Sequence, residues 1–196
     1  KENQERVFPI IIEGIKSFVA KNNLSSVHIT FCSLEEFERG GGLGLLKRTS
    51  SQFHWKNDNY KNFQDFLDAL SSRKRKNIRK ERDRAKSFGG KIVRYTGTEI
   101  TEKHWDAFWD FYLDTGNRKW GQPYLTRNFF EIAGKKLGKE LLMILAEVDG
   151  NPIAGALNFI GQDALFGRYW GCTESYSNLH FEICYYQAIE YAIENS

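Results

Sequence analysis

The chain has 196 residues, of which 41% are hydrophobic and 15% aromatic, a composition that excludes a disordered chain. This length provides for one or two small domains with real cores, and no apolar run approaches the ~20 residues that would span a bilayer. The net charge of +3 does not by itself indicate a partner, and the charged first residues are not followed by a signal-peptide core.

The beginning of the chain predicts helices and short strands. Residues 6–21 carry apolar side chains at helical spacing, and Pro9 would lie in the first turn, where its missing N–H costs little. Ser33 and Glu36 have the spacing of a capping box, which predicts a short helix. The remaining apolar stretches predict strands at residues 27–32, 43–48 and 52–55.

A long basic helix is predicted next, capped by Asn62 and ended by Gly89. Its cations are Arg73, Lys74, Arg75, Lys76, Arg79, Lys80, Arg82, Arg84 and Lys86. One interpretation is a solvated helix face with Glu81 and Asp83 as partners. The other is a phosphate-binding patch for nucleic acid, CoA or an anionic membrane surface.

From residue 91 the pattern reads strand, helix, helix, three strands, helix. The two middle helices start at Thr101 and Thr126, and Asp149-Gly150 predicts a tight hairpin between the first two strands of the meander. The last strand covers residues 165–170, and the last helix covers residues 179–194 with Asn178 as its cap. We therefore expect an α+β fold with a mixed, mostly antiparallel sheet flanked by helices.

The order of elements resembles that of the GNAT acyltransferase fold, but in two incomplete pieces. Residues 1–60 resemble the C-terminal part of a first GNAT-like domain, and residues 91–196 the N-terminal part of a second. Residues 61–90 would be the basic helix that links them. We expect either a fragment of a longer tandem protein or two part-domains that associate into one permuted unit.

Cysteines and histidines limit the chemistry. Cys32, Cys172 and Cys184 show no CxxC spacing, which argues against a structural disulfide and fits a reducing cytoplasm. The histidines show no HxH or HxxxH spacing, so we expect no metal site. Cys184 is either a nucleophile or a small buried hydrophobe, as free cysteines usually are.

Several stretches resemble a bacterial family of FemAB-like predicted N-acyltransferases, also described as peptidoglycan biosynthesis/recognition proteins. They are SSQFHW at 50–55, SRKRKNIRKER at 72–82, HWDAFWDFYLDTGNRKWGQPYLTRNFF at 104–130, IAGALNF at 153–159 and GRYWGCTESYSNLHFEICYYQAIEYAIE at 167–194. The resemblance covers residues 43–196 and, more weakly, 1–42. It implies a tandem GNAT fold and acyl transfer to an amine. The glycine-rich charged segment that follows the final helix in this family is absent here.

In GNAT-like folds the strand before the last helix separates from its neighbour and admits the acyl carrier, whose phosphates face the helix N-terminus. The acetyl-CoA loop Q/R-x-x-G-x-G/A does not occur between residues 170 and 180, where GCTESYSNLH stands. We expect no permanently bound cofactor and leave acyl-CoA and aminoacyl-tRNA open as co-substrates.

Arg168, His180 and Glu182 are the predicted catalytic group, because a base must accept the amine proton and donors must stabilise the oxyanion. Each also has a structural alternative: an ion pair for Arg168, a hydrogen-bonded histidine for His180 and a helix-dipole partner for Glu182. Strand alternation predicts that Arg168 and Trp170 share one face and that Tyr169 lies on the other.

Further residues are predicted to bind substrate or carrier. The aromatic and basic loop at residues 116–127 is either a ligand-binding loop or a packed turn. The predicted substrate-binding residues are Trp120, Tyr124, Arg127, Tyr169, Trp170 and Tyr185. The predicted phosphate- or carrier-binding residues are Arg75, Arg79 and Asn178.

These residues favour an N-acyltransferase that moves an acyl or aminoacyl group from acyl-CoA or aminoacyl-tRNA to an amine on a small molecule or a cell-wall precursor. The alternative is a non-catalytic module of the same fold that binds peptidoglycan fragments or nucleic acid through the basic helix. A purely structural protein leaves the polar residues at 168–182 unexplained.

Overall fold

The computed structural model describes residues 2–118 and 123–196. The chain forms two compact units, Lys1–His54 and Trp55–Ser196. Each unit is described by itself.

The first unit contains two helices, α1 (Glu2–Lys21) and α2 (Leu34–Gly42). The predicted capping box starts α2: the Glu36 amide donates to Ser33 Oγ at 3.3 Å, and the Ser33 amide donates to Glu36 Oε2 at 2.8 Å. Both helices were predicted from local spacing and capping, and both are confirmed.

The three strands predicted at residues 27–32, 43–48 and 52–55 are wrong, because these stretches form neither strands nor helices. A strand needs a partner that completes its hydrogen-bond ladder, and the described part of the first unit contains no sheet. Most of the apolar side chains that prompted the prediction are exposed, with Leu46 at 93% and Phe53 at 95%.

The second unit is built on one antiparallel sheet with strand order β1-β2-β3-β4. The strands are β1 (Lys91–Thr96), β2 (Leu141–Val148), β3 (Asn151–Ile160) and β4 (Leu165–Cys172). The predicted hairpin joins β2 to β3, with positive φ values of 50° at Asp149 and 73° at Gly150. Two successive positive φ values are what a two-residue type I′ turn requires.

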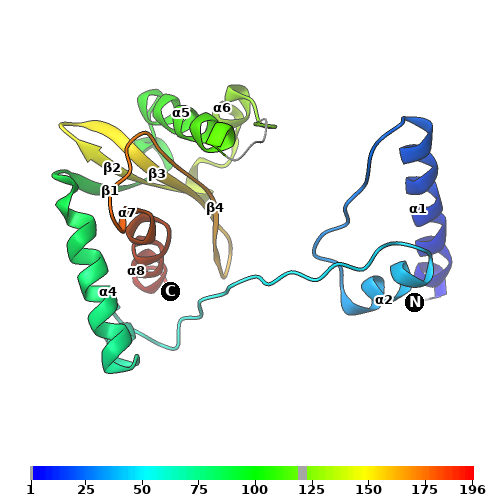
Figure 1. Ribbon diagram of the computed structural model, residues 1–196, viewed down its shortest axis with the longest axis horizontal. Helices are drawn as coiled ribbons and strands as arrows, with labels where there is room; N and C mark the ends of the chain where they lie inside the picture. Colours follow the sequence, from blue (N-terminus) through cyan, green and yellow to red (C-terminus); the bar gives the residue numbers. More distant parts are fainter. Residues whose placement is uncertain (1, 119–122) are drawn as a thin grey trace. The chain divides into compact units, whose positions relative to one another are not determined.

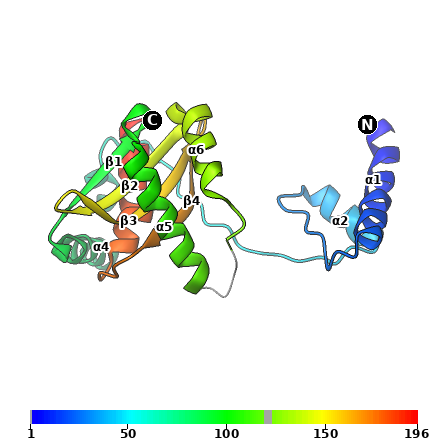
Figure 2. The same ribbon diagram turned by 90° about the horizontal axis from the view of Figure 1, so that it is seen from above.

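Helices cover both faces of this sheet (Figures 1 and 2). On one face lie α5 (Glu102–Arg118) and α6 (Arg127–Lys136). On the other lies the C-terminal helix, which consists of α7 (Leu179–Phe181), a π-helical turn η4 (Glu182–Tyr186) and α8 (Gln187–Glu194). Short 3-10 turns η2 (Gly97–Glu99) and η3 (Gly138–Glu140) flank the sheet. The predicted α+β class is confirmed.

Strand β2 shows why both faces are covered. Its even-numbered residues, Leu142, Ile144 and Ala146, are buried with the C-terminal helix, whereas its odd-numbered residues, Leu141, Met143 and Leu145, are buried with α5 and α6. A strand that is apolar on both faces requires cover on both. This strand is therefore the centre of the fold.

The basic segment forms two helices rather than the single one predicted. These are α3 (Phe63–Asp68), capped by the Asn62 side chain, and α4 (Ser72–Ala85), followed by the 3-10 turn η1 (Lys86–Phe88). Ser71 has an extended backbone at the N-cap of α4 and interrupts the helix. Serine favours caps over helix interiors, which explains the break. Gly89, with φ of 79°, follows the basic segment as predicted.

Close contact between α5 and the end of β4 depends on Gly171. A Cβ atom placed there would lie 2.3 Å from the carbonyl oxygen of Phe111, and backbone cannot move aside cheaply. We expect Gly171→Ala to lower the free energy of unfolding by about 3 kcal/mol, the upper part of the range for overpacked cores. Urea denaturation would measure this change. Gly138→Ala is the matched control, because its Cβ would lie 4.0 Å from the nearest atom, and equal effects of the two substitutions would contradict the prediction.

Candidate functional site along strand β4

Strand β4 lies at the edge of the sheet and is irregular in its middle. Within the described residues it pairs only with β3, so its other edge has no ladder partner. Two side chains of α5 bind carbonyls of β4: Thr115 Oγ1 donates to Trp170 at 3.1 Å, and Arg118 Nη2 donates to Cys172 at 3.0 Å. The register shifts at Leu157/Asn158: Tyr169 faces Leu157, Gly167 faces Asn158, and Arg168 is the additional residue of a β-bulge. Bulges redirect side chains and often occur beside functional sites.

The bulge corrects one prediction. Arg168 does not share a face with Trp170, because its Nη2 donates to Tyr124 Oη at 3.3 Å and its guanidinium lies 5.1 Å from the centre of the Tyr169 ring. Strict alternation fails where an extra residue enters the strand. Arg168 therefore lies beside Tyr169, on the side of the sheet that α5 and α6 cover.

Tyr124, Arg168 and Tyr169 form the first group of candidate site residues. The two phenol oxygens are 3.0 Å apart. Tyr169 packs against Tyr112 and Phe130, whereas Tyr124 is 70% exposed. Burial, followed by the hydrogen bond with Tyr124, raises the pKa of Tyr169 to about 12, so the phenol stays protonated near neutral pH. A guanidinium and two phenols can together bind a carboxylate, a phosphate or a developing oxyanion.

Trp170, His180 and Tyr185 form the second group, on the opposite face of β4. The exposed His180 ring lies 5.0 Å from the Trp170 ring and 5.8 Å from the Tyr185 ring, both edge-on. His180 is in the first turn of the C-terminal helix, directly after the loop that leaves β4. An exposed imidazole in an aromatic setting beside a free sheet edge can act as a base or contact a ligand.

Glu182 does not join either group. Its side chain is 2% exposed and pairs with Arg82 through both carboxylate oxygens, with distances of 2.9 to 3.2 Å. Gln187 Nε2 donates to the same carboxylate at 2.7 Å. The π-helical turn η4 explains this contact, since it brings residues five apart onto one side of the helix. The structure thus separates the three residues that were predicted to act together.

The carboxylate belongs to a closed ring of polar contacts that links α4, β1 and the C-terminal helix. Arg82 and Arg94 both donate to Glu190, at 2.9 and 3.0 Å, and Arg94 also donates to Gln187 at 2.8 Å. Desolvation of the Arg82 guanidinium acts to lower its pKa, but Glu182 and Glu190 outweigh this and the pKa is raised. The ring fixes the position of the helix that carries His180.

The other predicted binding residues have identified partners or lie elsewhere. Arg127 pairs with Glu102 and Asp106, at 2.9 and 2.7 Å, and so connects α6 to α5. Arg75 pairs with Asp68 at 2.6 Å, and Arg79 donates to Gln64 at 3.1 Å.

Asn178 occupies the predicted N-cap position of the C-terminal helix, but its side chain makes no capping bond and its φ is left-handed, at 64°. An asparagine tolerates this conformation well, and the residue serves as the turn into the helix. Trp120 lies outside the described residues.

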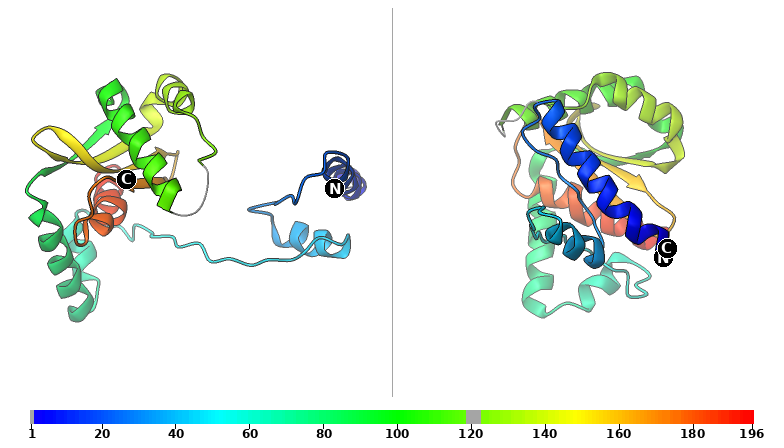
Figure 3. Two further views of the ribbon diagram at one scale, coloured as in Figure 1. Left: turned by 45° about the horizontal axis from the view of Figure 1, so that its top comes forward. Right: turned by 90° about the vertical axis from the view of Figure 1, so that its right-hand side faces the viewer.

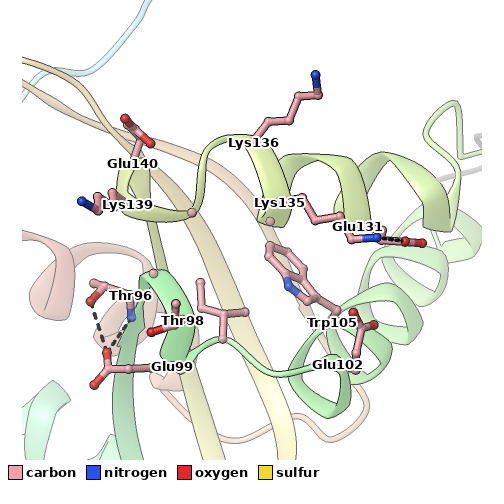
Figure 4. A pocket seen from close by; sticks show the side chains of 14 residues that line it. Thr96, Thr98, Glu99, Glu102, Trp105, Glu131, Lys135, Lys136, Lys139 and Glu140 are labelled. Carbon is pink, nitrogen blue, oxygen red and sulfur yellow. Dashed lines mark hydrogen bonds and ion pairs between the residues drawn. The ribbon is translucent and has the colours of Figure 1, made fainter.

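One hollow lies away from both groups. It has a volume of about 820 Å³ and is drawn in Figure 4. The buried Trp105 lines it. Charged residues at its rim bind other protein groups: Lys135 donates to Glu131 at 2.5 Å, and Glu99 accepts from the Thr96 amide at 2.9 Å. None of the catalytic, substrate-binding or carrier-binding residues predicted from the sequence lines this hollow. A second hollow of about 430 Å³ lies between α3, α4 and α8.

The burial of Cys172 and Cys184 indicates structural rather than catalytic roles. Burial raises the pKa of Cys184 to about 12, which leaves almost no thiolate near neutral pH, and Cys172 is buried. We therefore expect Cys184→Ala to retain full transfer activity. In the native protein a maleimide at pH 7 should label the half-buried Cys32 first, as mass spectrometry would show, and Cys184 only after denaturation. Rapid labelling of Cys184 in the folded chain would contradict this.

Sequence reasoning missed the partners rather than the residues. Tyr124 and Arg168, which bind each other, are 44 residues apart in the sequence. Arg82 and Arg94 bind the C-terminal helix, which carries Glu182, over a separation of 100 residues. Glu182, Glu190 and Glu194 follow one another at intervals of eight and four residues along the last helix, and this spacing could have indicated a face directed at basic residues.

The sheet, its covering helices and the two polar groups define an α+β protein with a candidate ligand site along an edge strand. The chain belongs to the FemAB-like family of peptidoglycan biosynthesis/recognition, which it matches over residues 1–196. This confirms the family resemblance drawn from the sequence and extends it over the whole chain. Comparison with curated proteins gave no match. In the described part of the chain, no helix combines the length and apolar character needed to cross a membrane.

Proposed function

We propose that the protein transfers an acyl or aminoacyl group from a carrier to an amine of a peptidoglycan precursor. The observation that carries the proposal is the edge of β4, which has no neighbouring strand within the described residues and is flanked by Tyr124, Arg168 and Tyr169 on one face and by His180 on the other. Membership of a peptidoglycan biosynthesis/recognition family supports a transferase at this coarse level.

The chemistry assigns a role to each group. Backbone N–H groups of an unpaired edge can hold an extended acyl arm, and the extra residue of the bulge interrupts the ladder at the same place. The Arg168 guanidinium and the protonated Tyr169 phenol supply donors for the oxyanion of the tetrahedral intermediate. His180 accepts the proton that the attacking amine releases as the new C–N bond forms, and the proton then passes to the thiol or hydroxyl of the carrier as its bond to the carbonyl carbon breaks. The GNAT-like fold inferred from the order of elements is consistent with such an arrangement.

A donor panel tests this function. Acyl-CoA thioesters and aminoacyl-tRNAs would be incubated with the protein and with lipid-linked or soluble peptidoglycan precursors, and amide formation would be followed by mass spectrometry. We expect transfer with one class of donor and its loss in Arg168→Gln. No transfer and no thermal stabilisation with any donor would refute the proposal and favour a module that only recognises peptidoglycan.

A further inference from the structure

Helix α4 has two charged faces, which differ in whether their charged side chains bind partners within the second unit. On the inner face, Arg75, Arg79 and Arg82 bind Asp68, Gln64 and Glu182. Glu81, one of only two acidic residues of the helix, is bound by the Tyr186 hydroxyl. This face lies against the C-terminal helix (Figure 3) and accounts for the packing of α4.

The outer face carries a straight stripe of four cations, Arg73, Lys76, Lys80 and Arg84. They follow one another at intervals of three, four and four residues, which places them on one side of the helix about 5–6 Å apart. The stripe is about 16 Å long at the rise of an α-helix. All four residues are exposed, and among residues 55–118 and 123–196 none of the four forms an ion pair with a carboxylate.

This arrangement is unfavourable for the isolated helix. Like charges three or four residues apart destabilise a helix, and Asp83, the other acidic residue, makes no ion pair within the described second unit. The sequence thus concentrates charge on one face without a compensating partner inside the unit. An external polyanion would supply the missing compensation.

The composition of the face identifies the kind of polyanion. A helix that lies in a bilayer surface needs apolar side chains to insert, and none of the exposed large hydrophobic residues belongs to α3 or α4. Binding to single-stranded nucleic acid needs exposed aromatic side chains for base stacking, and α4 has none. Contact with the phosphates of a duplex needs only correctly spaced cations.

We propose that the outer face of α4 docks on the phosphodiester backbone of double-helical nucleic acid, through Arg73, Lys76, Lys80 and Arg84. The contact is with phosphates and is independent of base sequence. It does not depend on the proposed transfer reaction, because the stripe shares no residue with the candidate site along β4.

The test is fluorescence anisotropy with a labelled 20-base-pair duplex, made once as DNA and once as RNA, over a range of KCl concentrations. Four neutralised phosphates predict a slope of about −3.6 for log K against log salt, so the affinity should fall about 10²-fold between 50 and 200 mM. The variant R73Q/K76Q/K80Q/R84Q should lose most of this affinity and of the slope. Glutamine preserves helix propensity, and circular dichroism would verify the fold.

The matched control removes the same charge elsewhere in the same unit. Lys56, Lys61, Lys136 and Lys139 are exposed, and K56Q/K61Q/K136Q/K139Q should retain binding close to that of the unmodified protein. Equal losses in both variants would overturn the proposal in favour of a non-specific effect of net charge. Binding to vesicles containing phosphatidylglycerol, with no binding to either duplex, would also overturn it and indicate a lipid surface.

Discussion

Glu182→Gln is expected to lower the free energy of unfolding by about 3 kcal/mol, the lower end of the range for breaking a buried ion pair. Glu182 is 2% exposed and receives both arms of the Arg82 guanidinium. Its replacement by a neutral glutamine leaves the partly buried Arg82 guanidinium with one carboxylate partner fewer. Arg82 retains Glu190, which is why the loss should not reach the upper end. Urea denaturation followed by circular dichroism measures the change.

Two further variants show whether charge is the cause. Glu194→Gln removes a half-exposed carboxylate that binds Arg94 at 2.6 Å, and it should cost no more than about 1 kcal/mol. The double variant Arg82→Met/Glu182→Leu removes both buried charges and should recover most of the loss. A midpoint for Glu182→Gln equal to that of the unmodified protein would show that the ring does not hold the C-terminal helix.

His180→Gln is expected to reduce the rate of acyl transfer by about 10² to 10⁴-fold, the usual contribution of a positioned general base. The side chain is exposed, so the free energy of unfolding should change by no more than about 0.5 kcal/mol. Steady-state rates over a range of pH values, with the donor that the panel selects, would measure the effect. The rate of the variant should stay low at every pH value tested, because it has no imidazole to accept the proton.

His28→Gln is the matched control for this experiment. His28 is exposed in the first unit, where it contacts Ser26 at 3.2 Å, and its replacement should leave the rate unchanged. If His180→Gln retains both the rate and its dependence on pH, His180 is not the base. The proposed function would then need a different proton acceptor, although the role of Arg168 could still hold.

Local sequence signals predicted most of the second unit and the helices of the first. The β2–β3 hairpin follows from Asp149-Gly150 between two apolar runs, and the start of α2 follows from Ser33 and Glu36. The helices and strands from residue 91 onward were predicted in the correct order. Each signal acts between residues a few positions apart, so it can be read without knowing what packs against it.

The candidate site could be predicted only in part. The sequence indicated Arg168, His180 and Glu182 by their chemical types, but not that a bulge directs Arg168 toward Tyr124 or that Arg82 binds Glu182. A bulge exists only relative to a partner strand, and an ion pair across 100 residues depends on how helices pack.

The sequence by itself therefore determined the order of elements from residue 91 onward, the apolar core strands and the family of the protein. Only the tertiary structure decided which polar side chains meet at β4, which cations of α4 remain exposed, and that residues 27–32 and 43–48 form no strands. The physical reason is the range of the interactions. Capping, turns and periodicity are short-range, whereas strand pairing, bulges and buried ion pairs exist only between segments that folding brings together.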